Sequence, residues 1–283
     1  MTVPHFLLIL GLLGLGLIGW GYALATAVPV VRTASVVLLD WPAGAPPVKA
    51  LLISDIHVAG PDMPPARLER LVSRINALRP DLVLIAGDFV SDKRTATRHY
   101  SVAEAVAPLG GLRARLGSVA VLGNHDHWRD AGATREALAK AGVKLLDNDA
   151  IQLGPLAIGG LNDAFTRRDD LPATLRRLRA LPGARLLLSH SPDPFAQLPA
   201  DVALMLAGHT HCGQIALPLI GPLSTMSAYG DRYACGLVRE RGQTLIVGAG
   251  VGTSMLPLRI GVPPDLWLIE LRSETTVRSA ATR

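Results

Sequence analysis

The chain has 283 residues, a formal net charge of +5 and 49% hydrophobic residues. This length permits one sizeable hydrophobic core and a short additional segment. The basic residues are scattered and form no long stripe with interleaved aromatic side chains, so we expect no nucleic-acid partner. The two cysteines, Cys212 and Cys235, are too few for a disulfide framework. We expect two free thiols, and a single bridge between them is the alternative.

The N-terminal segment is apolar and carries no charged side chain before Arg32. Residues 6–28 form one apolar run, which as a helix with a rise of about 1.5 Å per residue is long enough for a hydrocarbon core of about 30 Å. We predict a single-pass transmembrane anchor over residues 1–31, which would place the protein in the cell membrane. A cleaved signal peptide is the alternative, because Ala25-Thr26-Ala27 resembles a cleavage site, although no Lys or Arg precedes the run. Arg32 and Lys49 follow the span, so the positive-inside rule favours a cytoplasmic domain.

The remaining chain divides into a tether and one domain. Residues 32–47 end in a proline-rich stretch and are predicted as a tether, 48–272 as the domain and 273–283 as a C-terminal tail. In the first half of the domain, apolar runs alternate with amphipathic segments. We expect strands at 48–54, 82–86 and 119–122, and helices at 65–78, 102–116 and 134–141.

The second half of the domain contains little helix after Ala180. Further strands are expected at 156–159, 186–188, 202–206, 233–238, 244–247 and 266–271. Alternation of strand and helix in the first half implies parallel pairing and an α/β fold. The later strands imply a second, mixed sheet that packs on the first.

Polar side chains follow five of these strands at the point where each strand ends. They are Asp55 and His57, then Asp88, then Asn124, His125 and Asp126, then His190, and finally His209 and His211. Strand ends face the ligand crevice in open α/β sheets, so these groups should converge in space. Imidazole and carboxylate groups with one amide oxygen suit Mn, Zn, Fe or Co. Seven candidate ligands are too many for one tetrahedral ion, so we predict two divalent ions that share a bridging carboxylate.

The motif set resembles that of the calcineurin-like metallophosphoesterase family. The resemblance rests on D-x-H (Asp55, His57), G-D (Asp88), G-N-H-D (Asn124, His125, Asp126), a single H (His190) and G-H-x-H (His209, His211), in the family's order. It implies a four-layer αββα sandwich of two mixed sheets flanked by helices. The stretches at 208–223 and 248–264 further resemble a bacterial branch whose members often carry an N-terminal membrane or export segment.

The resemblance also implies roles for these residues. Asp55, His57 and His211 would hold the first metal, Asn124, His190 and His209 the second, and Asp88 would bridge them. A bridging water or hydroxide would attack phosphorus in line, and His125 would protonate the leaving oxygen or stabilise its charge.

This chain departs from the family pattern at Ser91. Relatives commonly place an acidic residue there, which can orient the catalytic histidine, so Asp92 or Asp126 is expected to take that role. Arg94 and His127 are the candidate substrate-binding residues.

We predict hydrolysis of a phosphodiester or pyrophosphate, with lipid-linked substrates favoured by the anchor. Phosphomonoester hydrolysis is the alternative, and a non-catalytic metal-binding scaffold is a third hypothesis from a different class.

Overall fold

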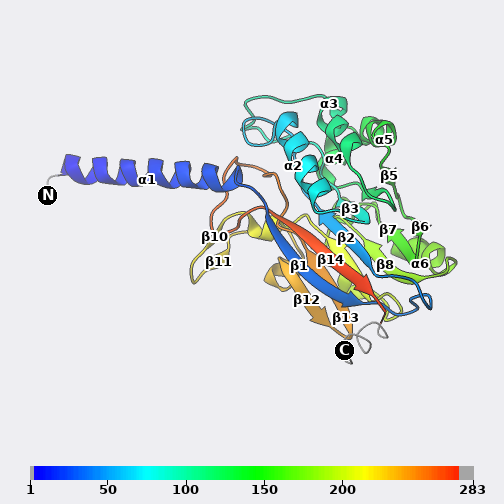
Figure 1. The fold of residues 1–283 in the computed structure, drawn as a ribbon. Helices are drawn as coiled ribbons and strands as arrows, with labels where there is room; N and C mark the ends of the chain where they lie inside the picture. The colour runs from blue at the N-terminus through cyan, green and yellow to red at the C-terminus, as the bar shows by residue number, and fades with distance from the viewer. Residues whose placement is uncertain (1–2, 274–283) are drawn as a thin grey trace.

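The computed structural model describes residues 3–273 of the chain. Its first element is helix α1 (Val3–Ala25), which projects away from the rest of the molecule (Figure 1). Most of its side chains are exposed, and the helix is long and apolar enough to cross a membrane. It ends ahead of Pro29, whose fixed φ and missing N–H disfavour continuation of a helix.

The domain is built on two six-stranded mixed sheets. The first sheet, in spatial order, consists of β1 (Val30–Val37), β14 (Asp265–Arg272), β2 (Val48–Ile53), β3 (Leu82–Ala86), β4 (Ser118–Val121) and β5 (Lys144–Leu145). The second consists of β12 (Gly236–Glu240), β13 (Gln243–Val247), β9 (Leu204–Ala207), β8 (Ala184–Leu188), β7 (Leu156–Gly160) and β6 (Asp149–Leu153). Two short strands, β10 (Ala216–Leu217) and β11 (Gly221–Pro222), form a separate hairpin.

Helices cover the outer faces of both sheets. The α-helices after α1 are α2 (Pro65–Ala77), α3 (Val102–Val106), α4 (Asn124–Arg129), α5 (Ala131–Lys140) and α6 (Leu171–Arg179), and the 3-10 helices are η1 (Ala107–Gly111), η2 (Asp193–Gln197), η3 (His211–Gly213) and η4 (Gly230–Tyr233). Side chains alternate between the two faces of a strand. In β2, Ala50 and Leu52 therefore join the core between the sheets, whereas Leu51 and Ile53 join the core under α2, α3 and α5. A third core lies between the second sheet and α6. The predicted α/β fold of two packed mixed sheets flanked by helices is confirmed.

The prediction of a tether over residues 32–47 is wrong for its first part. Residues 30–37 form β1, which pairs in parallel with β14 along its whole length. The segment is rich in β-branched residues, which favour strands, and its prolines begin only at Pro42. Val36 and Leu38 are buried in the core between the sheets, so this part of the chain belongs to the fold.

Two predicted elements differ clearly in their bounds from the observed ones. The helix expected at 102–116 ends at Val106 and continues only as the 3-10 turn η1, because Pro108, Gly110 and Gly111 interrupt regular helical bonding. The strand expected at 233–238 begins instead at Gly236, after η4. The predicted C-terminal tail lies outside the described residues except for Ser273.

Candidate metal centre

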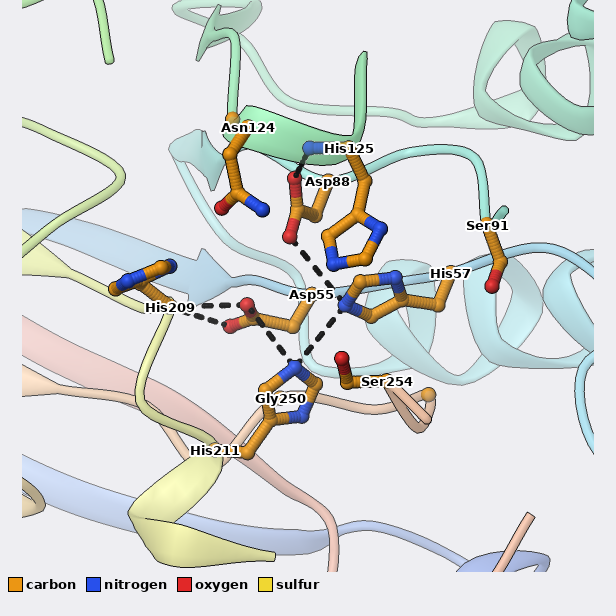
Figure 2. Close-up of polar contacts among 12 residues, drawn as sticks. Asp55, His57, Asp88, Ser91, Asn124, His125, His209, His211, Gly250 and Ser254 are labelled. Carbon is orange, nitrogen blue, oxygen red and sulfur yellow. Dashed lines mark hydrogen bonds and ion pairs between the residues drawn. The ribbon is translucent and has the colours of Figure 1, made fainter. Parts of the chain in front are cut away.

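The predicted ligands gather where the carboxyl ends of strands from the two sheets meet. Strands β2, β3 and β4 of the first sheet lead to Asp55 and His57, to Asp88 and to Asn124, whereas β8 and β9 of the second lead to His190 and to His209 and His211. Figure 2 shows most of these side chains pointing toward a common centre. All seven are buried, so the cluster is largely shielded from bulk water.

Asp55, His57 and His211 form one half of the cluster. The Nε2 atoms of His57 and His211 lie 3.0 Å apart, and Nε2 of His211 lies 3.5 Å from Oδ1 of Asp55. Their ligand atoms are close enough to one another to hold a single ion. Asp55 also accepts hydrogen bonds from the backbone N–H of His209, which ties this half to the strand end of the second sheet.

Asp88, Asn124, His190 and His209 form the other half. Nε2 of His190 lies 3.0 Å from Oδ1 of Asn124 and 3.2 Å from Nδ1 of His209. Oδ2 of Asp88 lies 3.3 Å from Nε2 of His190 and 3.4 Å from Nε2 of His57. One carboxylate oxygen therefore faces both halves.

Hydrogen bonds fix which nitrogen of two histidines faces the cluster. Nδ1 of His190 lies 2.7 Å from the carbonyl oxygen of Ala86, and Nε2 of His209 lies 3.2 Å from that of Met226. Each of these nitrogens must donate to its carbonyl, which leaves Nε2 of His190 and Nδ1 of His209 toward the centre. A carbonyl partner of this kind is the usual support of a metal-binding histidine.

The charges of the buried groups are strongly coupled. Burial lowers the pKa of both His57 and His211 well below the usual value, so these rings are neutral. Burial also raises the pKa of Asp55, to about 6. At His190, burial opposes the charged form, but the carboxylate of Asp88 raises the pKa of the ring well above its usual value. The cluster therefore carries more negative charge on its carboxylates than positive charge on its histidines.

The donor set fits divalent metal ions. Two neutral imidazoles with Nε2 atoms 3.0 Å apart cannot both direct an N–H at the other, but two lone pairs can face one cation at bond lengths of about 2.0–2.1 Å. Mixed imidazole and carboxylate ligands with an amide oxygen are typical of Zn, Mn, Fe or Co sites.

The backbone of the cluster is strained, as is common at functional sites. Asp55, His57, Asp88, His209 and His211 all have φ between 48° and 71°, the left-handed region that non-glycine residues rarely adopt. Two glycines permit the close packing. A Cβ at Gly123 would overlap Oδ1 of Asp88, and one at Gly208 would overlap Oδ2 of Asp55.

His125 stands at the edge of the cluster and is partly exposed. Its backbone N–H donates to Oδ1 of Asp88, and its ring lies 4.6 Å from that of His57. Nδ1 of His125 is 2.5 Å from Oδ1 of Asp92. Asp126 is turned away, and its buried carboxylate accepts backbone N–H groups of Asp88, Phe89 and Gly123. Of the two predicted orienting residues, Asp92 therefore contacts the histidine, and Asp126 organises the loops beneath it.

The two predicted substrate contacts lie differently. His127 is half-buried, and its Nε2 lies 2.7 Å from Oδ1 of Asn162. Arg94 is exposed on the loop after Asp88 and joins no ion pair within residues 3–273. Its neighbour Lys93 is buried and paired with Asp62 and Thr253, so this lysine serves the packing of the loops.

Two exposed aromatic residues beside the histidines were missed by the sequence reasoning. The ring of Trp128 lies 4.8 Å from that of His125, and the ring of Phe165 lies 4.6 Å from that of His209. The two aromatic rings are 6.3 Å apart. Trp128 directly follows the histidine-rich block at the start of α4, and that position is the signal that could have revealed it.

Arg259 is a third residue that the sequence reasoning missed, although it lies in the stretch 248–264 that resembles the bacterial branch. Its guanidinium is fully buried and donates to the carbonyl oxygens of Ala249 (2.7 Å), Gly250 (3.1 Å) and Gly252 (2.6 Å). These bonds fix the loop that carries Gly250. This loop packs directly against the cluster, because a Cβ at Gly250 would overlap Cβ of Asp55. Burial lowers the pKa of Arg259 to about 10, so it remains charged.

The expectation of two free thiols is wrong. Cys212, which directly follows His211, forms a disulfide with Cys235. The intervening segment passes through β10, β11 and η4 and returns to the second sheet, and this return brings the two cysteines together.

Comparison with known proteins places the chain in one family. The family model for the calcineurin-like phosphoesterases matches residues 48–213. The chain is 30% identical over 264 residues to the uncharacterized metallophosphoesterase YkuE of Bacillus subtilis, covering 90% of each chain. It is also 30% identical to a transmembrane protein with metallophosphoesterase domain of Danio rerio, covering 89% of this chain but 60% of that relative.

Among solved structures, a 5'-nucleotidase precursor of Thermus thermophilus aligns with a TM-score of 0.49 and 16% identity, over 83% of this chain and 58% of that one. The family model covers more than half of the chain, and the Bacillus relative matches over nearly its whole length. The chain therefore belongs to the calcineurin-like phosphoesterase family.

Proposed function

We propose that this protein is a membrane-anchored phosphoesterase that uses two divalent metal ions. In this proposal Asp55, His57 and His211 hold one ion, Asn124, His190 and His209 hold the other, and Asp88 bridges them. The supporting observation is the position of Oδ2 of Asp88, 3.4 Å from Nε2 of His57 and 3.3 Å from Nε2 of His190. A shared carboxylate is the usual link in two-metal hydrolytic sites.

The chemistry follows from what surrounds the cluster. When bound, two such ions lower the pKa of a water and neutralise the charge that develops on a phosphoryl group. His125 is partly exposed, so its Nε2 can reach a leaving oxygen and give it a proton. Asp92 accepts from Nδ1 and so keeps the orientation in which Nε2 faces the substrate. Trp128 and Phe165 are placed to contact the organic part of a substrate.

We infer that the substrate is a phosphodiester or pyrophosphate carried by a lipid. The support is α1, which would hold the metal centre at a bilayer, together with relatives that are named transmembrane proteins. The domain would extend over residues 48–272 together with β1.

A metal-loaded assay of the full chain in lipid nanodiscs tests this function. We expect turnover of a bis-nitrophenyl diester and faster turnover of a lipid pyrophosphate in the same disc. The Asp88→Asn variant should lose bound metal, and its turnover should fall on the order of 10²–10³-fold. Asp40→Asn, which changes an exposed carboxylate distant from the cluster, should retain both. Preference for a nitrophenyl monoester would favour phosphomonoester hydrolysis, and turnover unaffected by Asp88→Asn would contradict the two-metal assignment.

The disulfide bears on the side of the membrane. Arg32 and Lys49 favour a cytoplasmic domain, but disulfides are rare in the reducing cytosol. We infer that the domain lies on the non-cytoplasmic side. A membrane-impermeant maleimide applied to intact cells should therefore label a cysteine introduced at the exposed Leu39. Labelling only after lysis would place the domain in the cytoplasm.

A further inference from the structure

The domain exposes a group of large apolar side chains beside the end of α1. They come from the hairpin formed by β10 and β11 and from the loop at 253–258. We call them the apolar rim, and they are Leu219, Ile220, Leu223, Met255 and Leu256. Leu219 is fully exposed and Met255 is 77% exposed. Large exposed apolar side chains gathered on two neighbouring segments are typical of an interaction surface.

The two segments of the rim form one surface. The backbone N–H of Ala216 donates to the carbonyl oxygen of Ile260 at 2.9 Å, and the side-chain amide of Gln214 donates to the carbonyl oxygen of Leu256 at 3.0 Å. These bonds hold the base of the hairpin against the loop. The rim is therefore fixed to the domain at both of its segments.

Helix α1 leaves the domain through this same surface. The backbone N–H of Arg259 donates to the carbonyl oxygen of Gly21 at 3.0 Å, and the hydroxyl of Tyr22 lies 3.4 Å from the carbonyl oxygen of Pro61. The last turns of α1 are thus bonded to the loop that carries Met255 and Leu256. In Figure 1 the hairpin lies beside the C-terminal end of α1, and its closed end points obliquely away from the domain, to the side on which α1 projects.

Basic side chains also lie beside the end of α1. Arg70 and Arg74 of α2 line a pocket together with Tyr22, Val28 and Pro29 at the foot of α1. Both arginines are exposed, and within the described residues neither takes part in an ion pair. Cationic side chains that flank an apolar surface are suited to the anionic headgroups of lipids.

The rim is also connected to the metal centre. The loop after β11 carries Met226, whose carbonyl oxygen lies 3.2 Å from Nε2 of His209. The disulfide between Cys212 and Cys235 closes the whole segment and begins at the residue after His211. The same segment thus carries the hairpin part of the rim at its tip and contacts a predicted ligand at its base.

We propose that the apolar rim inserts into the lipid bilayer that α1 spans, as a second point of attachment. This docking fixes the orientation of the domain so that the metal centre faces the lipid surface. The proposal rests on the anchoring role of α1 in the proposed function. Insertion of a few large apolar side chains beside cations is the usual way in which a protein surface binds a membrane interface.

Site-specific fluorescence on the full chain tests this docking. Because both native cysteines are bonded, a cysteine introduced at Leu219 or Met255 is the single free thiol and accepts a fluorophore. The matched control is a cysteine at Leu39, which is 59% exposed, as is Leu223 of the rim, but lies on the loop between β1 and β2. The labelled proteins are placed in nanodiscs that contain phosphatidylcholine with a nitroxide near the headgroup end of the acyl chain.

We expect the nitroxide lipid to quench the fluorophore at positions 219 and 255. The fluorophore at position 39 should keep its fluorescence. Equal fluorescence at all three positions would overturn the proposal. Protection from aqueous iodide without quenching by the nitroxide lipid would also overturn it, because a protein would then cover the rim. A label at Ile220 repeats the test if one variant does not fold. Quenching requires no catalysis, so the two proposals can fail separately. Hydrolysis of a soluble diester without quenching would count against docking alone. Quenching without hydrolysis would count against the enzymatic proposal alone.

Discussion

At the scale of single residues, His125 lies at the edge of the cluster and is distinct from the proposed metal ligands. His125 touches Asp88 through its backbone and Asp92 through its ring, and both contacts leave Nε2 free for a substrate. It lies outside the two groups of ligands that would hold the ions. Its removal should therefore affect turnover without removing metal.

We predict that His125→Ala lowers kcat by about 10²–10⁴-fold, the usual contribution of a general acid. Elemental analysis should find unchanged metal content, because the proposed ligands are intact. Asp92→Asn should lower kcat less, since the histidine keeps its place and loses only its orienting carboxylate. Loss of metal from the His125 variant would instead show that His125 is a metal ligand. The ligand atoms of His57, Asp88 and His125 are close enough to one another for this outcome.

A second residue-scale prediction concerns the aromatic side chains. Trp128→Ala should raise KM for substrates with a large organic group and leave kcat nearly unchanged, because an exposed ring beside His125 can contribute binding but no proton. Steady-state kinetics on a small and a bulky diester measures the split. A fall in kcat with constant KM would show that the ring positions His125 instead.

The site could be predicted from the sequence as far as its motifs extended. Asp55, His57 and Asp88 follow apolar runs in positions where a sheet must bring them together, so strand order alone predicts their meeting. The choice between Asp92 and Asp126 could not be made, because it depends on which way two loop side chains turn. Phe165 lies outside the motifs, and nothing in the stretch 248–264 singles out Arg259, so only tertiary packing places these two residues at the cluster.

At the scale of elements, two connections outside the motifs support the centre. One is the disulfide, which begins beside His211 and encloses the hairpin of β10 and β11. Two cysteines that are separated by 23 positions give no sequence signal of pairing, so this bond was predicted incorrectly. The other is β1, whose β-branched run was interpreted as part of a linker because it follows directly on the apolar helix.

We predict that replacing both Cys212 and Cys235 by serine lowers the free energy of unfolding by about 2–4 kcal/mol, because the unfolded chain regains the entropy of an open loop. Chemical denaturation of the full chain in detergent measures this difference. Reduction of the unmodified protein should produce a similar loss, whereas reduction of the serine variant should have no effect. Equal stability of the two proteins would mean that the bond is not formed in solution.

Strand β1 gives a prediction for truncated chains. A fragment that begins at Val48 loses the pairing with β14 and the buried side chains of Val36 and Leu38. The loss of these two side chains alone should cost about 3–6 kcal/mol. A fragment that begins at Val28 keeps both. Thermal unfolding should separate the two fragments by roughly 10–20 °C, and coincident transitions would show that residues 30–37 do not belong to the folded domain.

At the scale of the whole molecule, α/β alternation in the first half and strand-rich sequence in the second were sufficient to predict two packed sheets. The parallel partnership of the first and last strands could not be predicted, because it joins residues more than 200 positions apart with no local signal. That long-range pairing carries the end of α1 to the same side of the domain as the hairpin and the loop at 253–258.

The short connection between α1 and β1 would change how such an enzyme searches for its substrate. Only residues 26–29 separate the end of α1 from the first residue of β1. A long flexible linker would let the metal centre sample a volume above the membrane and dilute its encounters with the surface. If α1 spans a bilayer as proposed, the metal centre stays at a constant height above it, so its encounters with lipids depend on lateral diffusion within the membrane plane. Under that proposal, the enzyme would meet phosphoesters embedded in the membrane often, and it would meet dissolved phosphoesters no more often than a freely diffusing enzyme does.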